Sequence, residues 1–278
     1  MGRSLISLII PVYNEEDNLQ LLHQRLAATL ADKPVDAEFI FVDDGSRDRS
    51  LAVVKELAKT HPEVKYLSFS RNFGHQVALS AGMDKAAGDA AIFIDADLQD
   101  PPEVVWQLIA KWLEGYEVVY AKRKNREGES VFKKWTAAAF YRLMGKMTAV
   151  PIPLDTGDFR IIDRKVMEAL KSMPEQHKFL RGQIAWIGFS QTYIEFERAK
   201  RHAGHTGYSL GKMIRFALDG ITSFSDLPLK FATWAGFIVS GLAFLAILYA
   251  LASRFMFDSY VQGWTSLLIS VLFLGGIQ

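Results

Sequence analysis

The sequence predicts an α/β fold, with a doubly wound, mostly parallel sheet followed by a hydrophobic C-terminal segment. Two observations lead to this prediction. Within residues 1–121, short apolar runs alternate with segments of helical periodicity, which is typical of repeated βαβ units. Residues 231–252 then carry no charged side chain, and a helix of that length can cross a lipid bilayer.

Composition narrows the class of protein. The chain has 278 residues, of which 50% are hydrophobic and 23% charged, so it is not a disordered chain. Its 32 Lys and Arg residues nearly balance 31 Asp and Glu residues. A net charge of +1 argues against a protein that binds nucleic acid through bulk basic charge. Because there is no cysteine, disulfides, zinc–thiolate sites and thiol nucleophiles are excluded.

Five buried strands are expected in the first 121 residues, each a short apolar run bounded by turn residues. They cover residues 5–10, 39–42, 64–70, 90–95 and 116–121. The first helix should follow Asn14 as its N-cap, because leucines at 19, 22, 26 and 30 share one helical face. The next three helices should begin near residues 46–48, near Gly74 and near residues 101–102.

The C-terminal region, residues 230–278, is expected to form a transmembrane helical hairpin. Its first helix, residues 231–252, would rise about 33 Å, which matches a hydrocarbon core of about 30 Å. Lys230 and Arg254 flank this helix as interface anchors. The second apolar run starts at residue 264 and is shorter than a full span, which predicts a truncated helix or a re-entrant segment. The alternative is a helix buried in a soluble protein or in an oligomer.

Two basic amphipathic segments, residues 130–147 and 209–226, are expected to lie in the lipid headgroup region, with packing onto the sheet as the alternative. The expected organisation is a catalytic domain (1–208), a juxtamembrane helix (209–229) and the membrane region (230–278). Residues 1–13 do not have the pattern of a secretory signal peptide, so we expect a cytosolic catalytic domain.

The strongest chemical signal follows the fourth expected strand, in the sequence Asp95-Ala96-Asp97-Leu98-Gln99. In extended backbone, side chains at i and i+2 point to the same side, so the two carboxylates should lie together. With the Gln99 amide nearby, they suit a hard divalent cation that binds oxygen and bridges phosphates. Simple helix capping is the alternative.

Polar residues also follow the first two strands, in Pro11-Val12-Tyr13-Asn14-Glu15 and in Val42-Asp43-Asp44-Gly45-Ser46. Adjacent strand ends of this kind can hold a base and a ribose while a cation binds the diphosphate. There is neither a GxxxxGK[ST] nor a GxGxxG motif, which excludes a P-loop and a dinucleotide-binding fold.

These three motifs together resemble family 2 glycosyltransferases of the GT-A fold. Residues 71–76 (Arg-Asn-Phe-Gly-His-Gln) and 95–102 resemble more specifically the polyprenyl-phosphate branch of that family. This branch includes dolichyl-phosphate mannose synthase and the undecaprenyl-phosphate glucosyltransferases of the GtrB type. The resemblance extends over nearly the whole chain, including its hydrophobic tail.

The resemblance implies a set of site residues. Those that would bind the nucleotide sugar are Pro11, Tyr13, Glu15, Asp43, Asp44, Gln76, Asp95, Ala96, Asp97 and Arg201. Those that would hold Mg²⁺ or Mn²⁺ are Asp95, Asp97 and Gln99. Candidates for the acceptor phosphate are Arg123, Arg126, Lys134 and Arg160, and for the first three a solvated surface role is an equal alternative.

The same resemblance implies a catalytic set made up of Asp158, Asp97 and Arg201. Asp158, in a segment like the one that lines the acceptor side in this branch, would orient the acceptor or sugar or act as a weak base. The alternative is a structural carboxylate that bonds Arg160 or a backbone amide. Arg201 begins a loop similar to the RxxGxS loop of the branch, although Thr206 replaces its serine and Gly207 stands where lysine is frequent.

We therefore predict an inverting transfer of one hexose, with UDP-glucose as donor and undecaprenyl phosphate as acceptor, at the cytosolic face of a bacterial inner membrane. A phosphomonoester is largely dianionic at neutral pH, so its approach to a diphosphate requires charge neutralisation more than a general base. The alternatives are transfer of mannose from GDP-mannose, transfer of an aminoarabinose, and a catalytically idle nucleotide-sensing membrane scaffold.

Further expectations concern partners and excluded activities. A separate flippase and a downstream transferase would handle the sugar–lipid product. The sequence leaves open whether the chain forms a homo-oligomer. Residues 183–186 (Gln-Ile-Ala-Trp) lack the arginine of the QxxRW motif of processive synthases, so polymerisation is not expected. The six histidines show no paired spacing of the kind that predicts a metal site.

Overall fold

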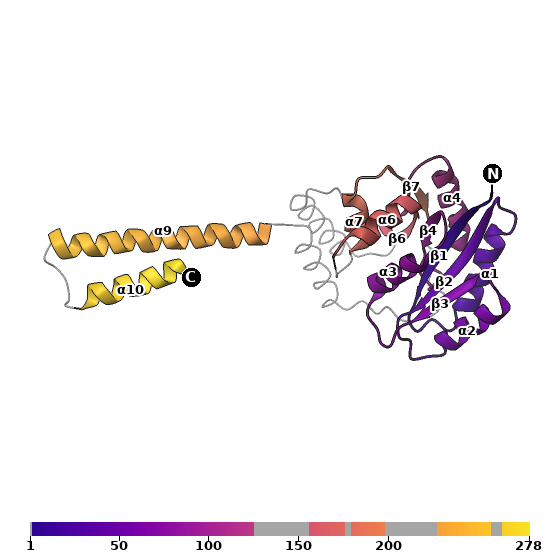
Figure 1. Cartoon of the computed structure of the whole chain (residues 1–278), viewed down its shortest axis with the longest axis horizontal. Helices are drawn as coiled ribbons and strands as arrows, with labels where there is room; N and C mark the ends of the chain where they lie inside the picture. The colour runs from indigo at the N-terminus through magenta and orange to yellow at the C-terminus, as the bar shows by residue number, and fades with distance from the viewer. Residues whose placement is uncertain (1, 125–155, 176–178, 198–226, 257–262) are drawn as a thin grey trace. The chain divides into compact units, whose positions relative to one another are not determined.

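The computed structural model describes residues 2–124, 156–175, 179–197, 227–256 and 263–278. They belong to two compact units. The first unit contains a seven-stranded sheet and its helices, and the second contains two apolar helices (Figure 1). The expected amphipathic segments, residues 130–147 and 209–226, lie outside the described residues.

The sheet has the strand order β3-β2-β1-β4-β6-β5-β7. The strands are β1 (Ser4–Val12), β2 (Val35–Asp43), β3 (Val64–Ser68), β4 (Ala90–Phe93), β5 (Val118–Arg123), β6 (Thr156–Asp163) and β7 (Gln191–Phe196). Only β6 runs antiparallel to its neighbours in this sheet, so the prediction of a mostly parallel, doubly wound α/β fold is confirmed.

Helices cover both faces of the sheet (Figure 1). They are α1 (Leu19–Leu30), α2 (Ser50–Thr60), α3 (His75–Lys85), the 3₁₀ turn η1 (Pro102–Val104), α4 (Val105–Leu113), α6 (Arg164–Ser172) and α7 (Leu180–Trp186). Side chains alternate along β1, so Leu8 packs in the core with α1, α2 and α4, whereas Ile9 packs with α3, α6 and α7. Full burial of such a side chain contributes about 1.5–3 kcal/mol.

Three expected boundaries are wrong. The N-cap of α1 is Asn18, because Asn14 adopts a left-handed conformation (φ 57°) and its side-chain oxygen accepts a hydrogen bond from the backbone N–H of Arg47. The second helix begins at Ser50, because the preceding polar residues form a loop. The fifth strand covers Val118–Arg123 and not residues 116–121.

The strand order reverses between β1 and β4, and their carboxyl ends separate there. β1 pairs with β2 as far as Val12, but its pairing with β4 ends at Ile9 and Phe93. Antiparallel β6 enters at this same edge, because Arg160 pairs with Phe93 and Asp158 precedes Arg160 by two residues. Ligands of open α/β sheets bind at such a reversal point, so the fold places polar residues of β1, β4 and β6 around one candidate site.

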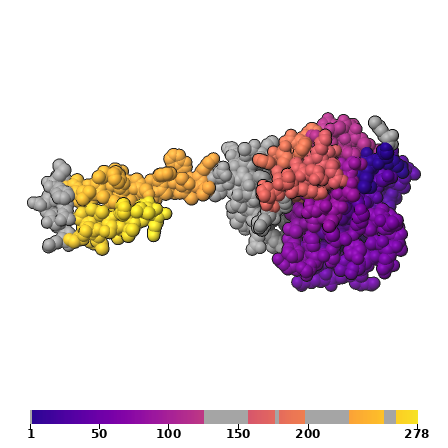
Figure 2. Space-filling view, viewed as in Figure 1, coloured from indigo at the N-terminus to yellow at the C-terminus, as the bar shows by residue number. Residues whose placement is uncertain are grey.

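The second unit consists of α9 (Leu227–Met256) and α10 (Trp264–Ile277). Within α9, residues Leu229–Ser253 form one helix that is long and apolar enough to cross a membrane, by length and composition, and it contains the expected span. The two helices lie side by side (Figure 2), and the Ser240 hydroxyl donates a 2.7 Å hydrogen bond to the Gly276 carbonyl oxygen.

Candidate active site

The loops that follow β1 and β2 are joined by hydrogen bonds at the carboxyl edge of the sheet. The backbone N–H of Asn14 donates to the Ser46 hydroxyl (3.1 Å), and the N–H of Arg47 donates back to the Asn14 side-chain oxygen (2.8 Å). The N–H of Glu15 donates to the Ser50 hydroxyl (2.9 Å). These contacts form a platform, which we define as residues 13–17 together with residues 45–50.

The buried carboxylates of Asp43 and Asp44 organise this edge further. Asp43 accepts hydrogen bonds from the backbone N–H of Ser46 (3.1 Å) and from the Ser68 hydroxyl (3.0 Å). Asp44 accepts from the backbone N–H groups of residues 73 and 74, at 2.7 and 2.9 Å, just before α3 begins. The two side chains therefore tie the loop after β2 to the end of β3 and to the loop that follows β3.

A pocket of about 360 Å³ lies between the platform and the loop after β3. Tyr13, Asp43, Arg47 and Arg71 contribute to its lining. Its size falls within the range of small-molecule sites. Gly45 has a φ of +69°, and a Cβ there would lie 2.5 Å from the backbone carbonyl carbon of Arg71, so only glycine allows the two loops to approach this closely.

Pro11 and Glu15 differ in their surroundings. Pro11 is buried in β1 opposite Val42. The pairing of β1 with β4 ends at Ile9, before Pro11. A proline, which has no backbone N–H to donate, is tolerated in a strand at such a position. Glu15 is partly buried and accepts a 2.6 Å hydrogen bond from the Asn18 side-chain amide. Both residues lie where the sequence places them, at the exit of β1.

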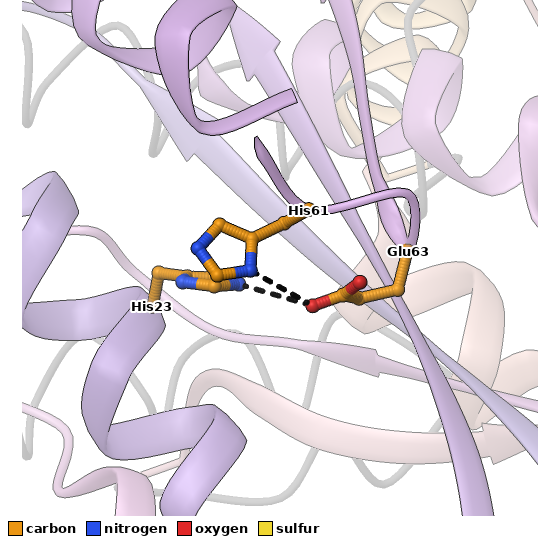
Figure 3. Close-up of side chains that lie close together, drawn as sticks. All are labelled: His23, His61 and Glu63. Carbon is orange, nitrogen blue, oxygen red and sulfur yellow. Dashed lines mark ion pairs between the residues drawn. The ribbon is translucent and has the colours of Figure 1, made fainter. Parts of the chain in front are cut away.

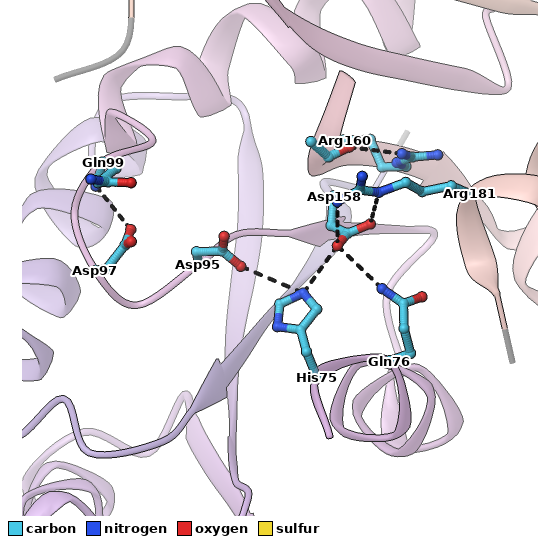
Figure 4. Close-up of polar contacts among 9 residues, drawn as sticks. His75, Gln76, Asp95, Asp97, Gln99, Asp158, Arg160 and Arg181 are labelled. Atoms are coloured by element: carbon cyan, nitrogen blue, oxygen red, sulfur yellow. Dashed lines mark hydrogen bonds and ion pairs between the residues drawn. The ribbon is translucent and has the colours of Figure 1, made fainter. Parts of the chain in front are cut away.

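The acidic turn after β4, residues 95–99, departs from the expected geometry. The strand ends at Phe93, and Leu98 has a left-handed φ of 58°, so the backbone turns instead of remaining extended. The carboxylate of Asp95 points toward His75, whereas that of Asp97 accepts a 3.1 Å hydrogen bond from the backbone N–H of Gln99 (Figure 4). The expectation that both carboxylates share one side of an extended strand is wrong, although both follow β4 directly.

Asp158 is the centre of a polar network on β6 (Figure 4). Arg181 of α7 binds it through two nitrogens, Nε at 2.7 Å and Nη2 at 3.0 Å from the two carboxylate oxygens. The Gln76 side-chain amide donates at 3.2 Å, and His75 Nε2 lies 3.1 Å away. Only 9% of the Asp158 side chain is exposed. Its arginine partner is therefore Arg181, and Arg160 instead donates to a backbone carbonyl oxygen of its own strand.

These contacts set the charge state of the network. Burial would raise the pKa of Asp158, but Arg181 and His75 hold it well below its usual value. Burial would lower the pKa of His75, but Asp95 and Asp158 raise it to about 9. Burial raises the pKa of Asp95, and the neighbouring Asp158 and Asp97 add to this shift while His75 opposes it. At neutral pH Asp158 is thus ionised and is a poor proton acceptor.

Of the four basic candidates for binding an acceptor phosphate, two lie among the described residues and two do not. Arg160 is buried, and burial lowers its pKa to about 10, so it stays charged at neutral pH. Arg123, at the end of β5, lies next to Gly157 at the same edge. Arg126 and Lys134 lie outside the described residues, as does Arg201, the residue expected to contact the diphosphate.

Two members of the network were not predicted as site residues. His75 lies in the quoted segment 71–76, but its partners come from β4 and β6, which only the folded sheet brings together. Arg181 had no sequence signal, because its contact with Asp158 depends on how α7 packs against β6. Gln76 and the partly buried Asp95 and buried Ala96 do lie at the predicted site.

The residues of the acidic turn fit a divalent cation that prefers oxygen ligands. Asp95 and Asp97 supply carboxylate oxygens within one turn. Burial is the main cause of the raised pKa of Asp95, and a cation would relieve the smaller part that comes from the neighbouring Asp158 and Asp97. Mg²⁺ and Mn²⁺ are the metals that such donors favour.

Comparison with known proteins identifies the family. The model of glycosyl transferase family 2 matches residues 7–171. The uncharacterized glycosyltransferase YkcC of Bacillus subtilis is 49% identical over 271 residues, which are 98% of this chain and 84% of that protein. The bactoprenol glucosyl transferase of Shigella phage SfV is 41% identical over 98% of this chain and 89% of its own length. The prophage bactoprenol glucosyl transferase homolog of Escherichia coli K12 is 42% identical with the same coverage.

Among solved structures, glucosyl-3-phosphoglycerate synthase of Mycobacterium tuberculosis, in complex with Mn²⁺, UDP-glucose and phosphoglyceric acid, superposes with a TM-score of 0.55. It is 23% identical and covers 80% of this chain and 79% of its own, which supports the GT-A fold. With the family match over residues 7–171 and relatives aligned along nearly the whole sequence, the chain is a glycosyltransferase and belongs to glycosyl transferase family 2.

Proposed function

We propose that this chain transfers one glucose from UDP-glucose to undecaprenyl phosphate, with inversion at the anomeric carbon. The observation that carries the proposal is the grouping of a pocket of about 360 Å³, an acidic turn and the Asp158 network at one edge of the sheet. The sugar and lipid are inferred from relatives named bactoprenol glucosyl transferase, which are 40–41% identical over 98% of this chain.

The nucleoside would bind in the pocket formed by the platform and the loop after β3. Tyr13 and Glu15 would contact it directly, while Pro11, Asp43 and Asp44 shape the surrounding loops. Asp95, Ala96 and Gln76 would contact the ribose, diphosphate or sugar. A divalent cation held by Asp95, Asp97 and Gln99 would supply charge neutralisation at the diphosphate leaving group.

The acceptor is a phosphate dianion, and its approach requires positive charge more than a base. Arg123 and Arg160 are the described candidates for this role, and Arg126 and Lys134 are the remaining ones. Arg201 would instead contact the diphosphate. Asp158 would act by orienting its neighbours, because a carboxylate with a lowered pKa accepts protons poorly. Its bond to Arg181 would fix that guanidinium beside the sugar and acceptor.

The apolar helix α9 would anchor the enzyme in a bacterial inner membrane, with the catalytic unit on the cytosolic side where nucleotide sugars are found. The lipid phosphate then lies at the same surface as the enzyme. The product carries its sugar on the cytosolic face, so a flippase and a second transferase would complete its use.

The direct test incubates the full chain in membranes with radiolabelled UDP-glucose, undecaprenyl phosphate and Mg²⁺ or Mn²⁺. We expect label to enter the organic-extractable lipid, and chelation of the metal to abolish this transfer until Mn²⁺ or Mg²⁺ is restored. Label from GDP-mannose but none from UDP-glucose would overturn the sugar assignment. No transfer from any nucleotide sugar, together with retained nucleotide binding, would indicate an idle scaffold.

The variant Asp97→Asn tests the role of the acidic turn. Loss of one charged ligand should lower the transfer rate by about 100-fold or more, because electrostatic stabilisation of the leaving group is weakened. The matched control is Asp84→Asn, at an exposed position of α3. Full activity of Asp97→Asn would contradict the metal assignment.

A further inference from the structure

A second cluster of polar side chains lies away from the candidate active site, near the amino end of β3. His23 comes from α1, His61 follows the last residue of α2, and Glu63 directly precedes β3. A nitrogen atom of each imidazole ring lies near the same carboxylate oxygen of Glu63 (Figure 3). One ligand atom from each residue lies within 4.8 Å of the others.

The distances within this cluster are too long for strong direct hydrogen bonds. His23 Nε2 lies 3.7 Å and His61 Nδ1 lies 3.4 Å from Glu63 Oε1. His23 is 2% exposed, and its Nε2 atom is buried without a hydrogen-bond partner among the described residues. A buried polar atom left in this state costs free energy unless another partner is bound.

These two nitrogen–oxygen distances are close to the spacing of ligand atoms around a tetrahedral zinc ion. Zinc–nitrogen and zinc–oxygen bonds of about 2.0–2.1 Å place neighbouring ligand atoms about 3.3 Å apart. Two imidazole nitrogens with one carboxylate oxygen are a donor set that favours zinc over Mg²⁺, whose ligands are nearly all oxygen. The cluster therefore differs in metal preference from the acidic turn after β4.

The ring of His23 is held in place by its surroundings. It contacts the Phe39 ring edge-on at 5.0 Å between centroids and the His61 ring at 4.4 Å. These ring contacts hold the buried Nε2 atom, which has no hydrogen-bond partner among the described residues, facing the Glu63 carboxylate.

We propose that His23 Nε2, His61 Nδ1 and Glu63 Oε1 bind one Zn²⁺ ion, which fastens α1 to the turn between α2 and β3. The side chains of His61 and Glu63 are 43% and 33% exposed, so water reaches the fourth coordination position. The role is structural, because the cluster lies at the amino end of β3 and the pocket lies at its carboxyl end.

The test uses the full chain in detergent, free of any polyhistidine tag and stripped of metal by a chelator. The stripped chain is then dialysed against Zn²⁺ together with an excess of Mg²⁺, so that Mg²⁺ fills any site made of oxygen ligands alone. Bound zinc is measured by elemental analysis, and thermal unfolding is followed with and without Zn²⁺. We expect one Zn²⁺ per chain and an unfolding temperature that rises with zinc, because the ion binds only the folded chain.

Two variants remove one ligand each at partly exposed positions, His61→Ala and Glu63→Gln. Each should weaken zinc affinity by more than about tenfold and abolish the zinc-dependent rise in unfolding temperature. The control Glu56→Gln, at an exposed carboxylate that pairs with Lys59 on α2, should bind zinc as the unaltered chain does. Absence of stoichiometric zinc in the unaltered chain, or unaltered binding by either variant, would overturn the proposal.

Discussion

Asp158 and Arg181 form a buried charge pair whose two members depend on each other. Removal of the guanidinium would leave a carboxylate that is 9% exposed with only His75 and Gln76 as the partners described above. We expect Arg181→Ala to lower the free energy of unfolding by about 3 kcal/mol, because an uncompensated buried charge is costly. Transfer activity should fall with it. Denaturant unfolding monitored by circular dichroism measures the first effect, and the lipid-labelling assay measures the second.

The matched control is Arg25→Ala. Arg25 also binds a carboxylate through two nitrogens, at 2.9 and 2.7 Å from Glu103, but this pair is exposed to solvent. Its loss should cost no more than about 1 kcal/mol and leave transfer unchanged. Equal effects of the two substitutions would show that burial does not set the strength of the Asp158 pair.

Gly45 allows a second test at the level of a single residue. In Gly45→Ala the new Cβ would lie 2.5 Å from the backbone of Arg71, so the loop after β3 must move and the pocket must change shape. We expect UDP affinity, measured by calorimetry, to fall by about tenfold, or 1.4 kcal/mol. Gly115→Ala is the control, because Gly115 has a φ of +103° with open space around it. The control should lose stability but keep UDP affinity.

At the level of elements, Glu38 connects several parts of the sheet. This buried residue of β2 accepts hydrogen bonds from Ser7 of β1, from Lys65 of β3 (2.6 Å) and from the backbone N–H of Ala87 before β4 (2.7 Å). Burial would raise its pKa, but these partners, led by Lys65, hold it below its usual value of 4.5. The ionised carboxylate therefore stabilises the arrangement of three strands.

This linkage predicts a pH dependence of stability. Because the folded pKa of Glu38 lies below the unfolded one, its contribution is present above about pH 4.5 and is lost as the pH falls through the lower, folded value. The unfolding temperature of Glu38→Gln should lie below that of the unaltered chain at pH 7, and the gap should shrink in acid. For Glu56→Gln, on the exposed face of α2, we expect little difference at either pH. A constant gap for Glu38→Gln would contradict the assignment.

The elements that the sequence predicts well are those with a strong local signal. The apolar runs around Leu8, Phe41 and Ile92 are buried on both faces of the sheet and were recognisable without tertiary information. The start of α1 was not, because Asn14 interacts with a loop that follows another strand. The insertion of antiparallel β6 between β4 and β5 was also not predicted, since strand order depends on pairing between distant segments.

The same distinction applies to the candidate site. Residues at or just beyond the ends of parallel strands, such as Tyr13, Asp43 and Asp95, were predicted because the ends of parallel strands meet at one edge. His75 and Arg181 were missed as partners of Asp158, because their contacts arise from how α3 and α7 pack against β6. The paired histidines of the zinc cluster likewise come from different elements and show no motif spacing.

At the scale of the whole molecule, the net charge of +1 is an average over two units of different composition. The sheet unit buries its apolar side chains, whereas α9 exposes large apolar side chains along its length, among them Phe237, Leu242 and Leu248. An exposed apolar surface of this extent marks a site of contact with a membrane or with another protein.

This difference predicts how the chain fractionates. Membranes washed with alkaline carbonate should retain the chain in the pellet, and detergent should release it, because the span Leu229–Ser253 is held by the hydrocarbon core. Immunoblotting of the two fractions provides the measurement. A peripheral membrane protein from the same cells is the control, and it should appear in the carbonate supernatant. Release of this chain by carbonate would instead favour a tail buried in an oligomer.

The hydrogen bonds that join residues 13–17 to residues 45–50 have a consequence for how donor preference changes during evolution. Because the Asn14 and Ser46 contacts, together with those of Glu16 with Asp48 and Arg49, link both loops, neither can shift without displacing the other. The platform under the proposed nucleoside pocket is therefore expected to change as a single unit. A switch to another base would then act most readily through side chains that line the pocket without hydrogen-bonding across the platform, and Tyr13, which is 42% exposed, is such a position.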